Sequence, residues 1–182
     1  MSAPVPVRPH ITYETLCGMP PDGQRYELFE GEAYMTPSPN LRHQFLVTRL
    51  LWAFNVALRG ASRVVPAPID VVLSPDTVVQ PDLVVVLENN AAILQDVIRG
   101  VPDLVVEVLS PSTAARDRAL KFETYARHGV SEYWIVDDDV PCVEIYRLAP
   151  GSSAYGQPGL GDEVTSPLLP SLALDVTNLF ED

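Results

Sequence analysis

Apolar residues recur every three or four positions in two segments of the chain, which predicts two long helices. The first has Ser38 as its N-cap residue and Pro39 at its first helical position, and it ends at Gly60. The second runs over about 110–127 and is ended by Gly129. Shorter helices are predicted at residues 12–17 and at about 90–98.

Runs rich in Val and Ile, separated by turn residues, predict the β-strands. The segment RYELFEGEAYM predicts a hairpin around Glu30-Gly31. Further strands are predicted at residues 63–73, 78–87, 101–109, 132–137, 142–148 and 163–165. The order of these elements predicts an α/β (α+β) fold in which helices flank a central mixed β-sheet.

The length of the chain predicts one domain. Its 182 residues and 19.9 kDa are enough for a substantial core. We expect a Pro-rich mobile tail over 1–10 and a single domain over 11–182. Two cysteines are too few for a disulfide framework. The N-terminus has no apolar signal core and no apolar run approaches the roughly 20 residues of a membrane span, so we expect a cytoplasmic protein without membrane association.

The net charge of −12 is unevenly distributed. Residues 130–182 carry ten acidic residues against one basic residue, Arg147. Such a balance argues against a protein that coats nucleic acid without specificity. It is compatible with a site whose carboxylates are neutralised by metal ions.

Asp82 and Glu107 are the first candidates for chemistry, because each lies beside an otherwise apolar strand. A buried carboxylate there needs a cation, a donor or a proton. Antiparallel pairing of the two strands would make the carboxylates neighbours, and such a pair suits Mg²⁺ or Mn²⁺. The alternative for Asp82 is a strand-entry residue, the role we assign to Asp103. Glu107 lies inside a predicted strand and has no role in a turn, which favours a functional role.

Lys121 is the only lysine in a chain with eleven arginines. It shares a helix face with Asp117 and Tyr125. The helix begins shortly after Glu107, so Lys121 is placed near the end of that strand. A surface ion pair with Asp117 is the structural alternative.

Four strings carry a family resemblance: PDLVVV with Asp82, VVEVLSPST with Glu107, DRALKFETYARHGVSEYWIVD with Lys121, and RYELFEGE. They resemble a large bacterial family of restriction-endonuclease-like proteins in the PD-(D/E)XK nuclease superfamily. The resemblance covers about Tyr13 to Phe180. It implies a restriction-endonuclease-like core whose metal site lies at the fork of two strands.

The resemblance also implies metal-assisted hydrolysis of DNA phosphodiester bonds. Asp82 and Glu107 would hold one or two Mg²⁺ ions, and Lys121 would orient water or stabilise charge on phosphorus. The superfamily pattern places a lysine two residues after the acid, where this chain has Leu109. The resemblance implies that the lysine has moved to the following helix.

Two further residues are candidates for the catalytic site. Among Glu27, Glu30 and Glu32 we prefer Glu30 as a supporting acid, with a solvated hairpin edge as the alternative. His43 falls in the first long helix, where the family pattern implies a residue that faces the site. A structural histidine is the alternative.

We expect DNA to bind the helix face with Arg116, Arg118, Lys121 and Arg127, together with Arg42 and Arg49 of the first helix. A homodimer is expected, because two equivalent sites can cut both strands of a duplex. Some of the apolar residues of the last strand pair could form the dimer interface: Tyr133, Trp134, Ile145 and Tyr146. The alternative is that these residues pack in the core.

Three functions remain open on the sequence. The first is a Mg²⁺-dependent endonuclease. The second is a catalytically weak or inactive nucleic-acid-binding or regulatory module with the same fold, which the low basic content favours. The third is an enzyme of another class that uses Asp82 and Glu107 as acid and base.

Overall fold

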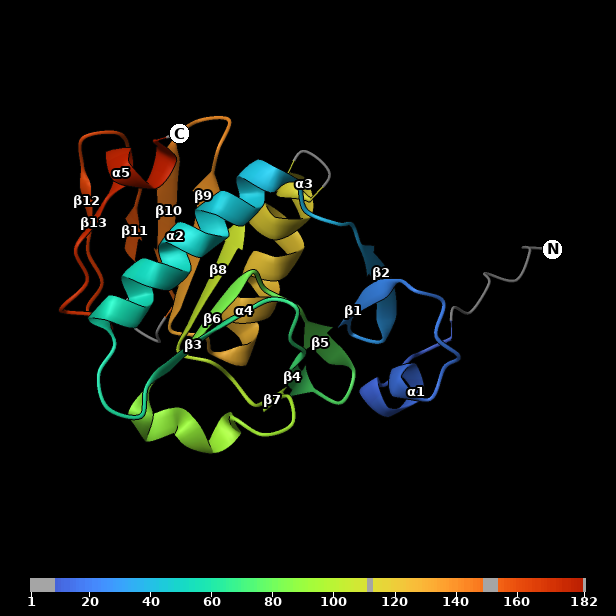
Figure 1. Cartoon of the computed structure of the whole chain (residues 1–182). Helices are drawn as coiled ribbons and strands as arrows, with labels where there is room; N and C mark the ends of the chain where they lie inside the picture. Colours follow the sequence, from blue (N-terminus) through green and yellow to red (C-terminus); the bar gives the residue numbers. More distant parts are fainter. Residues whose placement is uncertain (1–8, 111–112, 149–153, 182) are drawn as a thin grey trace.

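A six-stranded mixed sheet forms the centre of the computed structural model, which describes residues 9–110, 113–148 and 154–181 (Figure 1). The strand order is β11-β10-β9-β8-β6-β3, and β8 and β9 are parallel whereas the other neighbours are antiparallel. The strands are β3 (Arg63–Pro66), β6 (Leu83–Val86), β8 (Leu104–Val108), β9 (Glu132–Asp137), β10 (Cys142–Arg147) and β11 (Ala154–Gly156). The predicted mixed sheet with flanking helices is confirmed.

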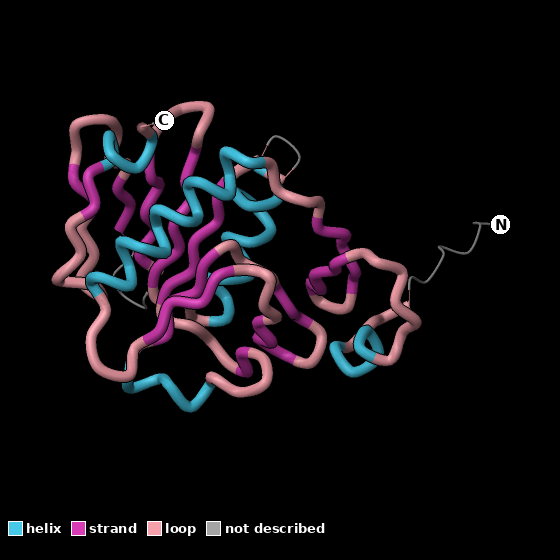
Figure 2. Tube along the Cα trace, viewed as in Figure 1, coloured by secondary structure: helices cyan, strands magenta, loops and turns pink. Residues whose placement is uncertain are grey.

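A second sheet carries the N-terminal hairpin, in the order β2-β1-β5-β4-β7. Its strands are β1 (Arg25–Phe29), β2 (Glu32–Thr36), β4 (Val71–Ser74), β5 (Thr77–Val79) and β7 (Ile98–Arg99). Figure 2 shows this sheet beside the larger one, with α1 (Tyr13–Cys17) at its outer side. The hairpin at Glu30-Gly31 and the Thr12 cap of α1 are both as predicted. A small pair, β12 (Glu163–Val164) and β13 (Leu174–Asp175), precedes α5 (Val176–Phe180).

Helices cover both faces of the six-stranded sheet (Figure 1). On one face α2 (Leu41–Ala57) buries Leu50 and Phe54 against Leu104 and Trp134. On the other face α4 (Phe122–His128) buries Tyr125 in a separate apolar cluster. Each fully buried large apolar side chain stabilises the fold by about 1.5–3 kcal/mol, so the two clusters hold the sheet between its helices. No helix within the described ranges has the length and apolar character that a membrane crossing requires.

The first long helix begins later than the sequence predicts. Asn40, and not Ser38, is the N-cap residue, because its side-chain oxygen accepts a hydrogen bond from the backbone N–H of His43 at 2.9 Å. Pro39 therefore lies before the helix. The helix ends at Ala57, with Leu58 as its C-cap residue, before the predicted end at Gly60.

The predicted strand over 63–73 is divided between the two sheets. Pro66 and Pro68 lack the N–H that continues a ladder, and the chain leaves the large sheet after Pro66 to enter the smaller one at Val71. The short helix predicted at about 90–98 is a 3₁₀ segment, η1 (Glu88–Ile93). Most of the predicted tail over 1–10 lies outside the described residues. His10 of this segment is described, and its Nε2 lies 3.2 Å from Asp76 Oδ2.

The second long helix contains a π-helical turn that the sequence pattern did not indicate. It consists of α3 (Ala114–Arg116), the π-turn η2 (Asp117–Lys121) and α4, and it ends at Gly129 in the left-handed conformation. It begins at Ala114, after the predicted start at about residue 110, and residues 111–112 of the predicted helix fall outside the described residues. Both ends of the π-turn, Asp117 and Lys121, are buried. Such turns are frequent at functional sites.

Candidate active site

Antiparallel pairing brings the start of β6 to the end of β8, as predicted. Leu83 lies opposite Val106, which places Asp82 beside Glu107 at one end of the strand pair. The backbone N–H of Val108 donates to Asp82 Oδ2 at 2.8 Å. This bond fixes the aspartate against the neighbouring strand, so Asp82 does more than begin a strand. Asp103, by contrast, accepts from the backbone N–H of Leu87 at 2.8 Å and from the Asn90 side chain at 3.2 Å, and it does not line the cavity described below.

Glu107 is buried and is bound by two side chains of the second long helix. Lys121 Nζ and Tyr125 Oη each donate to Glu107 Oε1 at 2.8 Å. No side chain in the described ranges bonds the other carboxylate oxygen, Oε2, although Glu107 lines a cavity. The contact to Lys121 links the end of β8 to the π-turn.

Two more acids join this cluster. Glu27 of β1 is completely buried, and its Oε1 lies 3.0 Å from Lys121 Nζ and accepts the backbone N–H of Gln80 at 2.9 Å. Its Oε2 lies 3.9 Å from Arg116 without a hydrogen bond. Asp117 Oδ1 lies 3.6 Å from Lys121 Nζ. One ammonium group thus faces three carboxylates.

Burial and mutual repulsion shape the electrostatics of this cluster. Burial raises the pKa of Glu107 well above its usual value, with Asp117, Asp82 and Glu27 adding repulsion that Lys121 only partly offsets. Burial likewise raises the pKa of Asp117. Burial alone would lower the pKa of Lys121, but attraction to Glu107, Glu27 and Asp117 outweighs it and raises this pKa. The lysine is therefore charged, and its single ammonium group is shared among three carboxyl groups.

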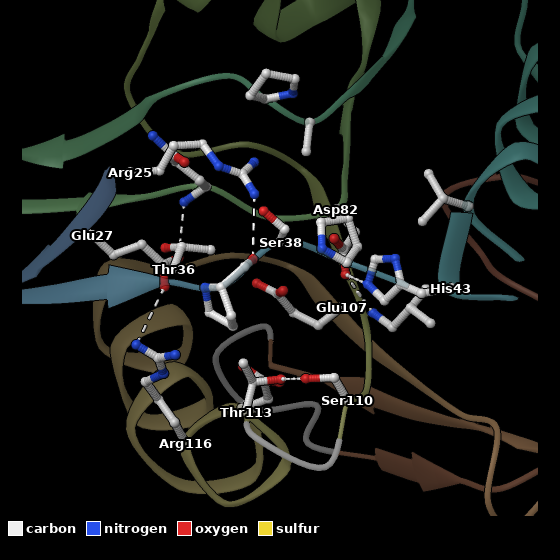
Figure 3. Close-up of a pocket in the computed structure, with 18 of the residues that line it drawn as sticks. Arg25, Glu27, Thr36, Ser38, His43, Asp82, Glu107, Ser110, Thr113 and Arg116 are labelled. Atoms are coloured by element: carbon white, nitrogen blue, oxygen red, sulfur yellow. Dashed lines mark hydrogen bonds and ion pairs between the residues drawn. The ribbon is translucent and has the colours of Figure 1, made fainter. Parts of the chain in front are cut away.

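These side chains line a cavity of about 140 Å³. In Figure 3 the carboxylate of Glu107 lies between Glu27 on one side and the Asp82–His43 pair on the other. The other lining residues include the polar Arg25, Gln80, Ser110, Thr113 and Arg116, together with apolar residues such as Val47 and Val108. Four carboxylates line this cavity against three basic side chains, Arg25, Arg116 and Lys121, and of these three only Lys121 is buried.

The donor set fits a hard divalent cation of the Mg²⁺ type. Asp82 and Glu107 each present a carboxylate to the cavity with one oxygen that the described residues leave unbonded. The described part of the chain holds no cluster of three or more His, Cys, Asp or Glu side chains arranged as a complete protein cage. Mg²⁺ characteristically binds one or two carboxylates and keeps water or substrate oxygens at its other positions. Two carboxylates beside a polar cavity meet that requirement.

His43 reaches the cavity from α2, as the family pattern implies. Its Nε2 lies 3.1 Å from Asp82 Oδ2, while its Nδ1 is buried and bonds to none of the described residues. Asp82 accepts at the same oxygen from Val108. His43 therefore orients Asp82 and is not an isolated core histidine.

In place of Glu30, the structure puts Glu27 in the cluster. Glu30 lies at the hairpin turn with a positive φ of 50°, is exposed, and pairs with Arg127 at the surface. Alternation along β1 explains the difference, because Glu27 shares its face of the strand with residues that point to the interior. The signal in the sequence was the position of Glu27 inside the mostly apolar strand RYELF.

The predicted DNA-binding arginines do not gather at the site. Arg118 Nη2 lies 2.5 Å from Asp137 Oδ2 and 2.6 Å from Glu144 Oε1, so it fastens the helix to β9 and β10. Arg42 pairs with Asp138 at 2.6 Å. Of the five arginines expected to bind DNA, namely Arg42, Arg49, Arg116, Arg118 and Arg127, only Arg116 lines the cavity. Arg25 and Gln80, which sequence reasoning did not select, line it as well.

Comparisons with known proteins identify the family and the fold of the chain. The profile of the Uma2 family, described as "Putative restriction endonuclease", matches residues 12–177. A crystal structure of a "putative nuclease belonging to DUF820" from Anabaena variabilis is similar to the chain, with a TM-score of 0.74 and 21% sequence identity. The match covers 93% of this chain and 97% of that one. At this identity the likeness supports the restriction-endonuclease-like fold. None of the curated proteins matches the chain.

Proposed function

The chain belongs to the Uma2 family of putative restriction endonucleases, and on that premise we propose that it is a metal-dependent endonuclease that hydrolyses DNA phosphodiester bonds. One observation supports this most strongly. Asp82, Glu107 and Lys121, from two strands and a helix, converge on one polar cavity. These are the residue types of the PD-(D/E)XK pattern, with the lysine supplied by the helix.

The negative charge of the cavity supports a divalent cation there. Removing a carboxylate from water without a partner costs several kcal/mol, and Lys121 is shared among three acids. Asp82 and Glu107 would hold Mg²⁺ or Mn²⁺. When bound, such an ion polarises the phosphoryl oxygen and lowers the pKa of its water.

The chain's own basic residues supply the remaining requirements of phosphodiester cleavage. Lys121 is held at its position by Glu107 and Glu27, so its ammonium can stabilise negative charge or orient a water without reorganisation. Arg25 and Arg116 line the cavity, where they attract a phosphate. His43 keeps Asp82 in place through the 3.1 Å contact.

A non-cleaving binding or regulatory module is the second candidate. The pairing of Arg118 and Arg42 with acids favours it, because it removes cationic charge from the expected DNA face. Nicking of supercoiled plasmid by the purified protein, with and without Mn²⁺, separates the two. The nuclease requires metal-dependent nicking, whereas the module requires DNA binding without it.

A homodimer is part of the proposal, with α2 as its contact. The four residues that the sequence offered for a dimer, Tyr133, Trp134, Ile145 and Tyr146, are buried or half-buried in the sheet. Four of the exposed large apolar side chains among the described residues lie instead in one line along the outer face of α2, at helical spacing: Leu41, Phe45, Trp52 and Val56. Such a line on an exposed helix is typical of an association surface.

The order of these side chains favours a second copy as the occupant. The line is symmetric about the midpoint between Thr48 and Arg49. A two-fold axis at that point pairs Leu41 of one copy with Val56 of the other, and Phe45 with Trp52. Thr48 is small and exposed at the axis, which permits close approach of two antiparallel helices.

A further inference from the structure

A second and larger cavity lies next to the active-site cavity. Its volume is about 690 Å³, within the range of sites for small organic ligands. It lies between α1 and the hairpin strands β1 and β2, which are neighbours in Figure 1. Arg25 and Gln80 line both cavities. A ligand in one cavity is therefore within reach of a group bound in the other.

Aromatic and apolar side chains form the walls of this second cavity. Tyr13, Leu16, Met19, Tyr26 and Ala33 all line it. The two tyrosine rings are held by their hydroxyl groups: Tyr13 donates to Asp70 at 2.9 Å and Tyr26 donates to Asp22 at 2.7 Å. Rings fixed in this way offer flat apolar surface with little further loss of conformational entropy, which suits stacking on a planar ligand.

Apart from Arg25, which also lines the first cavity, the charged side chains of this cavity are carboxylates, which accept hydrogen bonds. Asp22 and Asp70 contribute carboxylates. Gln80 donates its amide to Asp70 Oδ1 at 2.7 Å, which holds this carboxylate at the wall of the cavity. Carboxylates repel phosphate, so the cavity selects against the backbone of a nucleic acid. The same acceptors favour a planar group with N–H donors.

We propose that this cavity binds the nucleobase next to the scissile phosphate, turned out of the base stack. The inference rests on the proposed nuclease function, which places the phosphate in the adjacent cavity. The shared Arg25 lies between the two cavities and can contact the linking phosphate. Bases with an exocyclic amine, namely cytosine, adenine and guanine, match the acceptors, whereas thymine has only its ring N–H. The preferred substrate is thus single-stranded or locally unpaired DNA.

Equilibrium binding tests this assignment without cleavage. The Glu107→Gln variant is titrated in EDTA against fluorescently labelled short strands of oligo-dC and oligo-dT. We expect oligo-dC to bind at least fivefold more tightly. Adding Ala33→Trp, which fills the cavity, should remove that preference. Adding Met35→Trp, an exposed residue of the same strand that does not line the cavity, should keep it. Tyr26→Leu serves as a second cavity variant if Ala33→Trp does not fold.

Each outcome separates this inference from the nuclease proposal. Equal affinity for the two strands, absent binding, or a preference that survives both cavity variants overturns the nucleobase site. In those cases Mn²⁺-dependent plasmid nicking by the wild type would still support the nuclease. A preference that the cavity variants remove, in a protein that never nicks DNA, would support the base site and reject the nuclease.

Discussion

Lys121 Nζ lies 2.8 Å from Glu107 Oε1, although the two residues are separated by the end of a strand, a loop and a π-helical turn. In the family pattern the lysine follows the acid by two positions, where this chain has Leu109. The helix thus returns an ammonium group to the end of β8. The contact places the lysine beside the acid, which is the arrangement that the proposed role of Lys121 requires.

In the metal-free protein, the buried Glu107 carboxylate is expected to lower the stability of the fold at pH values above the usual pKa of a glutamate. Because burial raises its pKa, stability is highest when Glu107 is protonated and falls as pH rises from about 4.5 through the raised value. Glu107→Gln should therefore be as stable as wild type at pH 5 and more stable at pH 8. Thermal melts in EDTA at both pH values measure this. A variant that is less stable than wild type at pH 8 would contradict it.

Replacement of Lys121 should abolish cleavage and also reduce stability. The buried ammonium faces three carboxylates, and removing one partner of a buried ion pair costs about 3 kcal/mol, or roughly 6–12 °C in Tm for a domain of this size. Cleavage by Lys121→Met, normalised to the folded fraction, should fall at least 100-fold. Retained activity per folded molecule would show that the lysine is structural.

Substitution of Arg116 should affect DNA binding, whereas substitution of Arg118 should affect the stability of the fold. Arg116 lines the active-site cavity, whereas Arg118 joins the helix to Asp137 and Glu144. Arg116→Gln should weaken DNA binding and lower its salt dependence at unchanged Tm. Arg118→Gln should lower stability by about 1 kcal/mol and leave DNA affinity unchanged. Anisotropy titrations at two salt concentrations, with a melt of each variant, test the pair. If Arg118→Gln instead weakened DNA binding and Arg116→Gln lowered stability, Arg118 would belong to the DNA-binding face.

The line of exposed apolar side chains on α2 predicts that the protein is a dimer. Wild type should give a dimer mass in light scattering at micromolar concentration. Trp52→Glu should give a monomer, because it places a charge at the centre of the apolar contact. Leu160→Glu, at an equally exposed position outside α2, is the control and should remain dimeric. A monomeric wild type would refute the contact.

The sequence predicted the parts of the site that depend on local pattern. Asp82 and Glu107 stood out because they interrupt apolar strands, and antiparallel pairing then follows from their order. Glu27 was misjudged because a two-residue turn hides which strand face enters the core, so alternation alone could not choose between it and Glu30. The ion-pair partners of the arginines could not be predicted from the sequence, because Arg118 contacts Asp137 and Glu144 only through tertiary packing.

The π-helical turn shows a further limit of pattern reading. An α-helical spacing already places Asp117 and Lys121 on one face, so the sequence contained no sign of the wider turn. Both side chains are buried in the structure, which a surface ion pair would not require. The burial arises because Glu27 arrives from the separate N-terminal hairpin, far away in the sequence.

The joint metal site at Asp82 and Glu107 is the central claim, and a calorimetric Mn²⁺ titration tests it most directly. Wild type should bind Mn²⁺, and Asp82→Asn and Glu107→Gln should each lose that binding while remaining folded. Glu30→Gln, outside the cavity, is the matched control and should bind like wild type. Unchanged Mn²⁺ binding in either Asp82→Asn or Glu107→Gln would remove that residue from the site and contradict the account.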